Sequence, residues 1–186
     1  MTYATQYLSD FSDLCEQINP ELLDLMADLL NAVRDRGGRL FFLGVGGSAA
    51  NCSHAVNDFR KIAKIESYAP TDNVAEFSAR MNDDSWTETF TGYLAGSHLS
   101  RKDAIFVLSV GGGTPTASAN ITAACAMANE VGATILGIVS RDGGFTMQIA
   151  DACILIPTIR EATITPYAES MQAVLWHLLV NHPLLY

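Results

Sequence analysis

The stretch that most constrains the fold is 39–58, which reads as a buried strand, a tight turn and the start of a helix. The run LFFL at 40–43 is continuously apolar, which is typical of a strand covered on both faces. The segment GVGG at 44–47 supplies glycines, which let the backbone turn sharply and approach a ligand closely. We expect Ser48 to cap the helix that follows. The free N–H groups and the dipole of a helix N-terminus favour an anion such as phosphate, although a tight turn without a ligand explains the glycines equally well.

The composition limits the classes of protein and of partner. With 186 residues, 49% of them hydrophobic and 17% charged, the chain is long and apolar enough for one globular domain with a full core. The net charge of −9 argues against nucleic acid as the main partner, because phosphate backbones are bound by clustered Lys and Arg. A small phosphorylated ligand needs only a few amides and hydroxyls. The small charged share for this length indicates that part of the surface is covered in an oligomer.

We expect a cytoplasmic protein without a membrane segment. The opening MTYATQYLSD lacks the basic and apolar regions of a signal peptide, and no apolar run is long enough to cross a bilayer. Four cysteines are scattered without a CxxC pair or a zinc-finger spacing, at Cys15, Cys52, Cys125 and Cys153. We therefore expect them to be reduced and buried as small apolar residues.

The pattern of the whole chain predicts an α/β fold. Apolar residues recur at helical spacing from Tyr3 to Arg36 with a break at Asn19-Pro20, which predicts two N-terminal helices. Helical segments then alternate with short apolar runs, and the last helix runs from near Pro166 to before Pro183. The predicted strands are 40–43, 65–69, 104–110, 134–140 and 152–156. This alternation predicts a three-layer αβα sandwich around a five-stranded parallel sheet, which binds ligands at the carboxyl ends of its strands.

A second glycine loop follows the predicted strand 104–110. The stretch SVGGGTPTAS at 109–118 again joins a strand to a helix, and it adds hydroxyl groups to the glycines. Both loops leave the same edge of a parallel sheet, so they can converge on one phosphate.

The two loops together resemble a known family. GVGGS followed six residues later by His54 and ten residues later by Asp58 resembles the glycine–serine loop of the sugar isomerase (SIS) domain, and its phosphoheptose isomerase branch above all. The stretch 109–118 is similar to the family's Ser-x-Ser-Gly-x-Ser phosphate loop, with a short extension. The chain departs from the family at Val45, where Asn is usual, at Asp58, where Glu is usual, and at Gly111, where a serine is usual.

The resemblance implies a set of site residues. The family's final helix carries a Gln and a His eight residues apart, and Glu169 and His177 stand at these positions. It implies that a divalent metal, Zn²⁺ or one of similar preference, is held by His54, Asp58, Glu169 and His177, and that catalysis falls to Asp58, His177 and Glu169. The implied substrate-binding residues are Gly46, Gly47, Ser48, Asp83, Ser109, Gly111, Thr114 and Ser118.

Other interpretations of single residues stay open at this point. His177, next to Trp176 and Leu178, is explained equally well as a core histidine, and Asp83 as a solvated helix cap. A nucleotide cofactor fits poorly, because GVGGSA lacks the third glycine of the dinucleotide fingerprint.

The resemblance implies an aldose–ketose isomerase acting on a sugar phosphate, with sedoheptulose 7-phosphate as the candidate substrate. It implies one SIS domain over 1–186, in which helices 1–38 build a homo-oligomer (a tetramer or a dimer) and 39–186 form the α/β core. The alternative is a non-catalytic SIS protein that senses a sugar phosphate, or serves as a protein-binding scaffold of the type that associates with a replication initiator.

Overall fold

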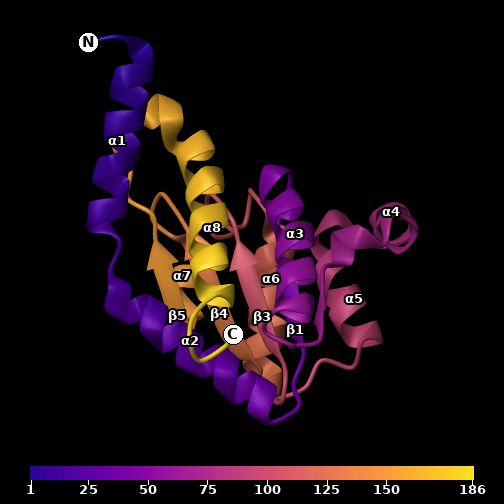
Figure 1. The fold of residues 1–186 in the computed structure, drawn as a ribbon. Coiled ribbons are helices and arrows are strands. Elements are labelled where there is room, and N and C mark those ends of the chain that lie inside the picture. The colour runs from indigo at the N-terminus through magenta and orange to yellow at the C-terminus, as the bar shows by residue number, and fades with distance from the viewer.

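The computed structural model describes residues 1–186 and has a central parallel sheet with helices on both faces (Figure 1). The sheet order is β2-β1-β3-β4-β5, and every neighbouring pair is parallel. This confirms the predicted fold class. No helix combines the length and the apolar character that a membrane span requires. The strands are β1 (Leu40–Leu43), β2 (Ser67–Tyr68), β3 (Ala104–Leu108), β4 (Thr134–Val139) and β5 (Ala152–Leu155).

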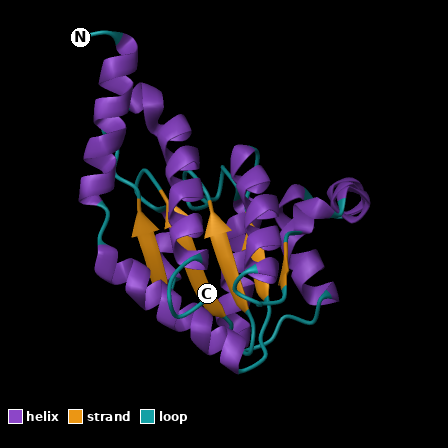
Figure 2. Ribbon diagram, in the orientation of Figure 1, coloured by secondary structure: helices purple, strands orange, loops and turns teal.

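Strands β1, β3 and β5 are apolar along their whole length because each face of the sheet is covered by a helical layer (Figure 2). Leu40 and Phe42 of β1 belong to the larger cluster of buried side chains, and Phe41 and Leu43 belong to the smaller one. The layer over the larger cluster consists of α1 (Tyr3–Gln17), α2 (Pro20–Asp35), α3 (Gly47–Lys61) and α8 (Ile164–Val180). The opposite layer consists of α4 (Val74–Asp83), α5 (Thr89–Gly96), α6 (Ala119–Val131) and α7 (Gly144–Ile149). Short 3₁₀ turns complete the chain at η1 (Pro70–Asp72), η2 (Trp86–Glu88) and η3 (Glu161–Thr163).

The N-terminal helices form as predicted, with the break at Asn19-Pro20. The Asn19 side chain accepts a hydrogen bond from the Glu21 amide at 2.9 Å, and Pro20 begins α2, a position that needs no N–H donor. Helix α1 extends beyond the sheet beside the N-terminal half of α8 (Figure 1). The two helices touch through Tyr7 and Tyr167, whose ring centroids lie 4.6 Å apart.

The strand order places a topological switch point between β1 and β3. From β1 the chain first adds β2 on one side and then β3 on the other, so the connections after β1 and β3 lead to opposite faces of the sheet. Helix α3 follows β1 on one face and α6 follows β3 on the other. In open parallel sheets, ligands bind at the carboxyl ends of the strands at such a switch point.

The start of α3 differs from the prediction. The N-cap is Gly46, with φ 64° and ψ −127°, and Ser48 lies inside the first turn. A backbone with this φ favours glycine, so the chain turns at Gly46 and the helix begins one residue before Ser48. The expectation that Ser48 caps the helix was wrong.

The cysteines follow the prediction with one exception. All four are free, and Cys52, Cys125 and Cys153 are buried, whereas Cys15 is exposed on α1. Burial raises the pKa of the Cys125 thiol to about 11 and that of Cys153 to about 12, so both stay protonated and unreactive. Cys15 is exposed because it lies at the edge of the face that α1 turns to the rest of the chain, next to buried Leu14.

Candidate active site at the carboxyl edge of the sheet

The loop between β1 and α3 brings the start of α3 against α8. Gly47 is the first residue of α3, and a Cβ built on it would stand 2.5 Å from Oε2 of Glu169. The absence of a side chain at Gly47 therefore makes room for the Glu169 carboxylate. Ser48, the next residue, is buried, and its hydroxyl makes no hydrogen bond within the chain.

The loop between β3 and α6 is held by its own hydroxyl groups. The Gly112 amide donates to Ser109 Oγ at 3.0 Å, and the Ala117 amide donates to Thr114 Oγ1 at 2.9 Å. Ser118 precedes α6 with φ 55°, and its hydroxyl makes no hydrogen bond to the helix. The Ser109 and Thr114 hydroxyls are thus engaged in shaping the loop, whereas the Ser118 hydroxyl is free for a ligand.

Gly111 leaves open space in this loop. A Cβ built on Gly111 would meet nothing nearer than Arg141 Cδ, at 4.0 Å. Gly112 is different, because its φ is +65° and a Cβ there would come within 1.9 Å of the Gly143 carbonyl oxygen. The loop requires glycine at 112 and not at 111.

Three of the predicted side chains form one cluster between α3 and α8. The Asp58 Oδ2 atom lies 3.7 Å from Nε2 of His54 and 3.7 Å from Nε2 of His177. One ligating atom from each residue lies within 4.8 Å of the other two. His54 and Asp58 share a face of α3 because they are four residues apart, and α8 supplies His177.

Neighbouring groups orient two members of the cluster. The Asn57 side chain donates from Nδ2 to Asp58 Oδ1 at 2.7 Å, which leaves Oδ2 for the two imidazoles. Nδ1 of His177 lies 2.7 Å from the Ala173 carbonyl oxygen. A carbonyl can only accept, so Nδ1 carries a proton and donates, and Nε2 is the ring nitrogen that faces the cluster.

The donor set fits a zinc-type ion. A tetrahedral ion with ligands at about 2.0–2.1 Å separates its donor atoms by about 3.3 Å, close to the spacing found here. Two imidazoles and one carboxylate are ligands that such an ion prefers, and three protein ligands leave a coordination position open. The side chains of His54 and His177 are 57% and 44% exposed, so the cluster is accessible from solvent.

Glu169 does not join this cluster. It stands eight residues before His177 on α8, which places it about 12 Å away along the helix axis, at the end beside Gly47. Asp83 is also apart. It is the last residue of α4, it is exposed, and its carboxylate accepts only from Asn82 Nδ2, at 2.7 Å.

The sequence prediction missed the polar contacts that align α3 with α8. Asn51 Nδ2 donates to the Glu169 carbonyl at 2.9 Å and to Gln172 Oε1 at 3.0 Å, and Gln172 is fully buried. One turn further along, the ring of His54 meets the ring of Trp176 at a centroid distance of 4.7 Å. The available signal was a line of polar residues on α3 at 51, 54 and 58, the spacing of one helix face.

Comparison with known proteins decides the family. A sequence profile of the SIS domain matches residues 6–140. The chain belongs to the SIS domain family. The predicted family is therefore confirmed.

This SIS domain is similar in sequence and in structure to several named proteins. It is 31% identical over 185 residues to the lincomycin biosynthesis protein LmbN of Streptomyces lincolnensis. This match covers 95% of this chain and 65% of that protein, so the chain spans just under two thirds of the length of that relative. It is 29% identical over 158 residues to the phosphoheptose isomerase of Rhodospirillum rubrum, covering 82% of this chain and 79% of that enzyme. The structure of the phosphoheptose isomerase GmhA from Neisseria gonorrhoeae superposes with a TM-score of 0.81 at 21% identity, covering 97% of this chain and 98% of that one. The fold of this SIS domain is thus that of phosphoheptose isomerases.

Proposed function

We propose that this SIS domain is an aldose–ketose isomerase that acts on a sugar phosphate, with sedoheptulose 7-phosphate as the candidate substrate. The observation that carries the proposal is the convergence of His54, Asp58 and His177 at one accessible point between α3 and α8. Similarity to enzymes named phosphoheptose isomerase supports the choice of reaction.

The phosphate group is proposed to bind where the two glycine loops meet. Helix N-termini present free N–H groups, and α3 and α6 follow the carboxyl ends of the neighbouring strands β1 and β3. The free Ser118 hydroxyl adds a donor at the start of α6. Substrate-binding roles for Gly46, Gly47, Ser48, Ser109, Gly111 and Thr114 follow from the same two loops.

The proton transfers are assigned to Asp58 and His177. Isomerisation needs a base that removes a proton next to the carbonyl and an acid that moves protons between the two oxygens. The Oδ2 atom of Asp58 and Nε2 of His177 are 3.7 Å apart, so both can reach adjacent atoms of one substrate. The hydrogen bonds from Asn57 and to Ala173 hold these two groups in place.

A divalent metal is part of the proposal. His54, Asp58 and His177 would hold it, and when bound it would polarise the sugar carbonyl. An ion on Nε2 of His177 would take the lone pair that proton transfer needs, so the proton-transfer role of His177 belongs to the cluster without an ion. Glu169 lies too far along α8 to reach the cluster of its own chain, so its proposed place is at the α3 end of the substrate.

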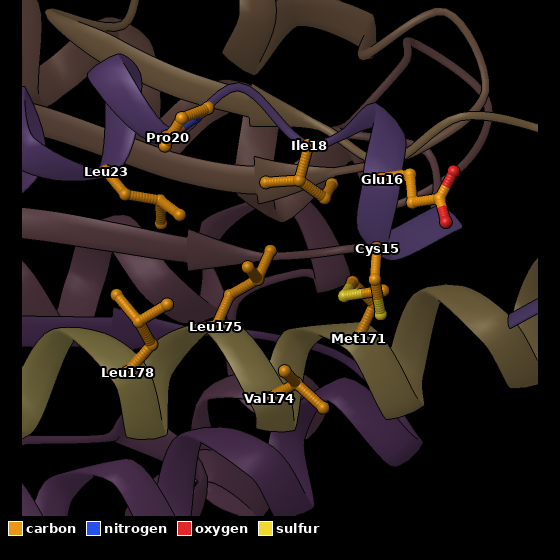
Figure 3. Close-up of a pocket in the computed structure, with 9 residues that line it drawn as sticks. All are labelled: Cys15, Glu16, Ile18, Pro20, Leu23, Met171, Val174, Leu175 and Leu178. Atoms are coloured by element: carbon orange, nitrogen blue, oxygen red, sulfur yellow. The ribbon is translucent and has the colours of Figure 1, made fainter. Parts of the chain in front are cut away.

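The proposed assembly uses an apolar groove between the N-terminal helices and α8 (Figure 3). The groove has a volume of about 400 Å³, and Leu23 of α2 lies across it from Leu175 and Leu178 of α8. Val174 and Leu178 remain 45% and 44% exposed, although they are large apolar side chains. A second copy that packs its helices here would bury them and give the homo-oligomer, a tetramer or a dimer.

A non-catalytic sensor or scaffold is the second candidate. The residues Val45 and Gly111, which depart from the family pattern in both loops, favour it. Retention of two histidines and a carboxylate in one cluster favours the enzyme, since a binding module does not need them.

Turnover measured on a panel of ketose phosphates, together with the metal content of the purified protein, tests the proposal. Wild-type protein should convert at least one substrate, and His177→Ala should lose turnover while keeping its fold and its sugar-phosphate affinity. The matched control is His98→Asn, which removes an exposed imidazole at a backbone position (φ 54°) that asparagine tolerates. Absence of turnover in wild type, or equal turnover in His177→Ala, would favour the sensor or scaffold.

A further inference from the structure

Trp176 carries a polar group that its surroundings do not satisfy. The side chain is fully buried on α8, and its indole Nε1 has no hydrogen-bond acceptor. A buried donor without an acceptor destabilises the folded state, and a leucine or phenylalanine in the same space would not carry that penalty. The presence of an indole here therefore indicates that Trp176 does more than fill the core.

The contacts of the indole ring suggest that reason. It stacks on the ring of His177, with centroids 3.5 Å apart and 28° between the planes. It also meets the ring of His54 at 4.7 Å and 70°. The two imidazoles lie 5.2 Å apart at 83°, so one rigid side chain touches both histidines of the cluster from the buried side.

His54 depends on this contact most. Its side chain is more than half exposed and makes no hydrogen bond within the chain, apart from the 3.7 Å approach to Asp58 Oδ2. His177, by contrast, is also held by the Ala173 carbonyl. An exposed side chain loses rotamer freedom when it binds a ligand, and a rigid aromatic neighbour reduces that loss in advance.

The polar contacts along α8 keep Trp176 turned toward α3. Gln172 lies one turn before Trp176 on the same face and accepts from Asn51 of α3 at 3.0 Å. This bond fixes the rotation of α8 about its axis, and with it the direction of the indole.

We propose that Trp176 is a positioning residue that holds the imidazoles of His54 and His177 in the arrangement in which they share one divalent ion with Asp58. The inference rests on the proposed metal site. It goes beyond that site by assigning a function to a buried residue that does not ligate the ion.

The chain offers a clean optical experiment because it contains only two tryptophans, Trp86 and Trp176. Trp86→Phe leaves Trp176 as the sole indole. Titration of this variant with Co²⁺, a quencher, should give saturable loss of tryptophan fluorescence, because the indole touches both ligating rings. The same titration of Trp86→Phe combined with His177→Ala should show no saturable quenching.

The affinity for Zn²⁺, measured by calorimetry, separates positioning from packing. Trp176→Leu should bind Zn²⁺ about 10–100-fold more weakly than wild type, the range found when groups that orient metal ligands are removed. Trp176→Phe, which keeps a ring, should lose less, and Trp86→Phe should bind as wild type does. Circular dichroism checks that each variant is folded.

Each outcome decides between the two claims. If wild type binds neither Zn²⁺ nor Co²⁺, the proposed metal site is wrong and the role of Trp176 is overturned with it. If wild type binds and both Trp176 variants bind equally well, the site stands and the positioning role is overturned. Should Trp176→Leu fail to fold, the positioning role is tested by the Zn²⁺ affinity of Trp176→Phe and by the Co²⁺ quenching of Trp86→Phe. The role is overturned if Trp176→Phe binds Zn²⁺ as tightly as wild type, or if Co²⁺ does not quench Trp86→Phe.

Discussion

The carboxylate of Glu169 lies over Gly47, so close that a Cβ on Gly47 would come within 2.6 Å of both carboxylate oxygens. This contact joins the middle of α8 to the first residue of α3. A negative charge therefore stands beside the helix N-terminus that would otherwise be the natural place for a phosphate. The phosphate of a substrate should for this reason bind closer to the loop between β3 and α6.

Replacing Glu169 by Gln should tighten the binding of a sugar phosphate by about tenfold, or roughly 1.4 kcal/mol. The change keeps the size of the side chain and removes its repulsion of the phosphate. Calorimetry at low and at high ionic strength tests whether charge repulsion is the cause. The gain in sugar-phosphate affinity should shrink at high ionic strength, because salt screens the charge of Glu169. Glu161→Gln, an exposed carboxylate in η3, is the matched control. Weaker binding by Glu169→Gln would mean that the carboxylate accepts hydrogen bonds from the sugar.

Replacing Ser118 by Ala should weaken sugar-phosphate binding by roughly 1–3 kcal/mol, the range for a lost charge-assisted hydrogen bond. The reason is that its hydroxyl is free at the start of α6. Ser48→Ala should have a smaller effect, because Ser48 is only 2% exposed. Unchanged affinity in both variants would reject the phosphate site at these loops.

Gly111 and Gly112 should respond in opposite ways to a larger residue. Gly111→Ser places its side chain in open space and restores the serine usual in the family, so it should fold normally and bind sugar phosphate about tenfold more tightly. Gly112→Ala puts a Cβ on the Gly143 carbonyl at a left-handed φ and should cost about 2–5 kcal/mol of unfolding free energy. Chemical denaturation and calorimetry measure both effects. Gly111→Ala separates the effect of added bulk from that of the hydroxyl.

The sequence predicted the strands well and the position of Glu169 poorly, for one physical reason. Strands such as LFFL are recognised locally, because a parallel sheet buries both faces and leaves continuous apolar runs. The positions of Glu169 and His177 depend on how α8 is rotated and shifted against α3. The Asn51–Gln172 hydrogen bond sets that rotation. These two residues are 121 positions apart in the sequence, so no local sequence pattern shows that their side chains meet.

The start of α3 shows the same limit on a smaller scale. Ser48 is a good N-cap by residue type, yet Gly46 takes the position because its φ of 64° lets the chain turn before the helix. The cluster of His54 and Asp58 was predictable from their spacing on one helix, whereas the orienting bond from Asn57 was not.

Stability should fall in acid through the ion pair between Asp10 and Arg160. Arg160 donates to the buried Asp10 carboxylate, and this bond, with a further one from Gln6, lowers the pKa of Asp10 below its usual 3.8. A carboxyl whose folded pKa is lowered stabilises the protein above its unfolded pKa, and the contribution is lost as the pH falls through the folded value. Asp10→Asn should therefore be less stable than wild type at pH 5–8, and the difference should shrink below about pH 4. Urea denaturation across this range measures it.

The matched control for the ion pair is Asp13→Asn, an exposed carboxylate on the same helix. It should change stability little at any pH. A difference between wild type and Asp10→Asn that stays constant down to pH 2 would show that the carboxylate charge is not the source.

The final prediction concerns assembly at the apolar groove. Val174 is 45% exposed on α8 and lines the groove, so Val174→Asp should leave the folded chain intact while placing a charge where a second copy would pack. Burying an unpaired charge destabilises an interface, so the variant should assemble less well than wild type. Light scattering at micromolar concentration should show wild type as a tetramer or dimer and the variant as a smaller species. Met81→Asp is the matched control, because Met81 is 50% exposed on α4, away from the groove, and this variant should assemble as wild type does. A wild type that is already monomeric would remove the assembly from the proposed function, and a variant that assembles normally would move the interface to another face of the molecule.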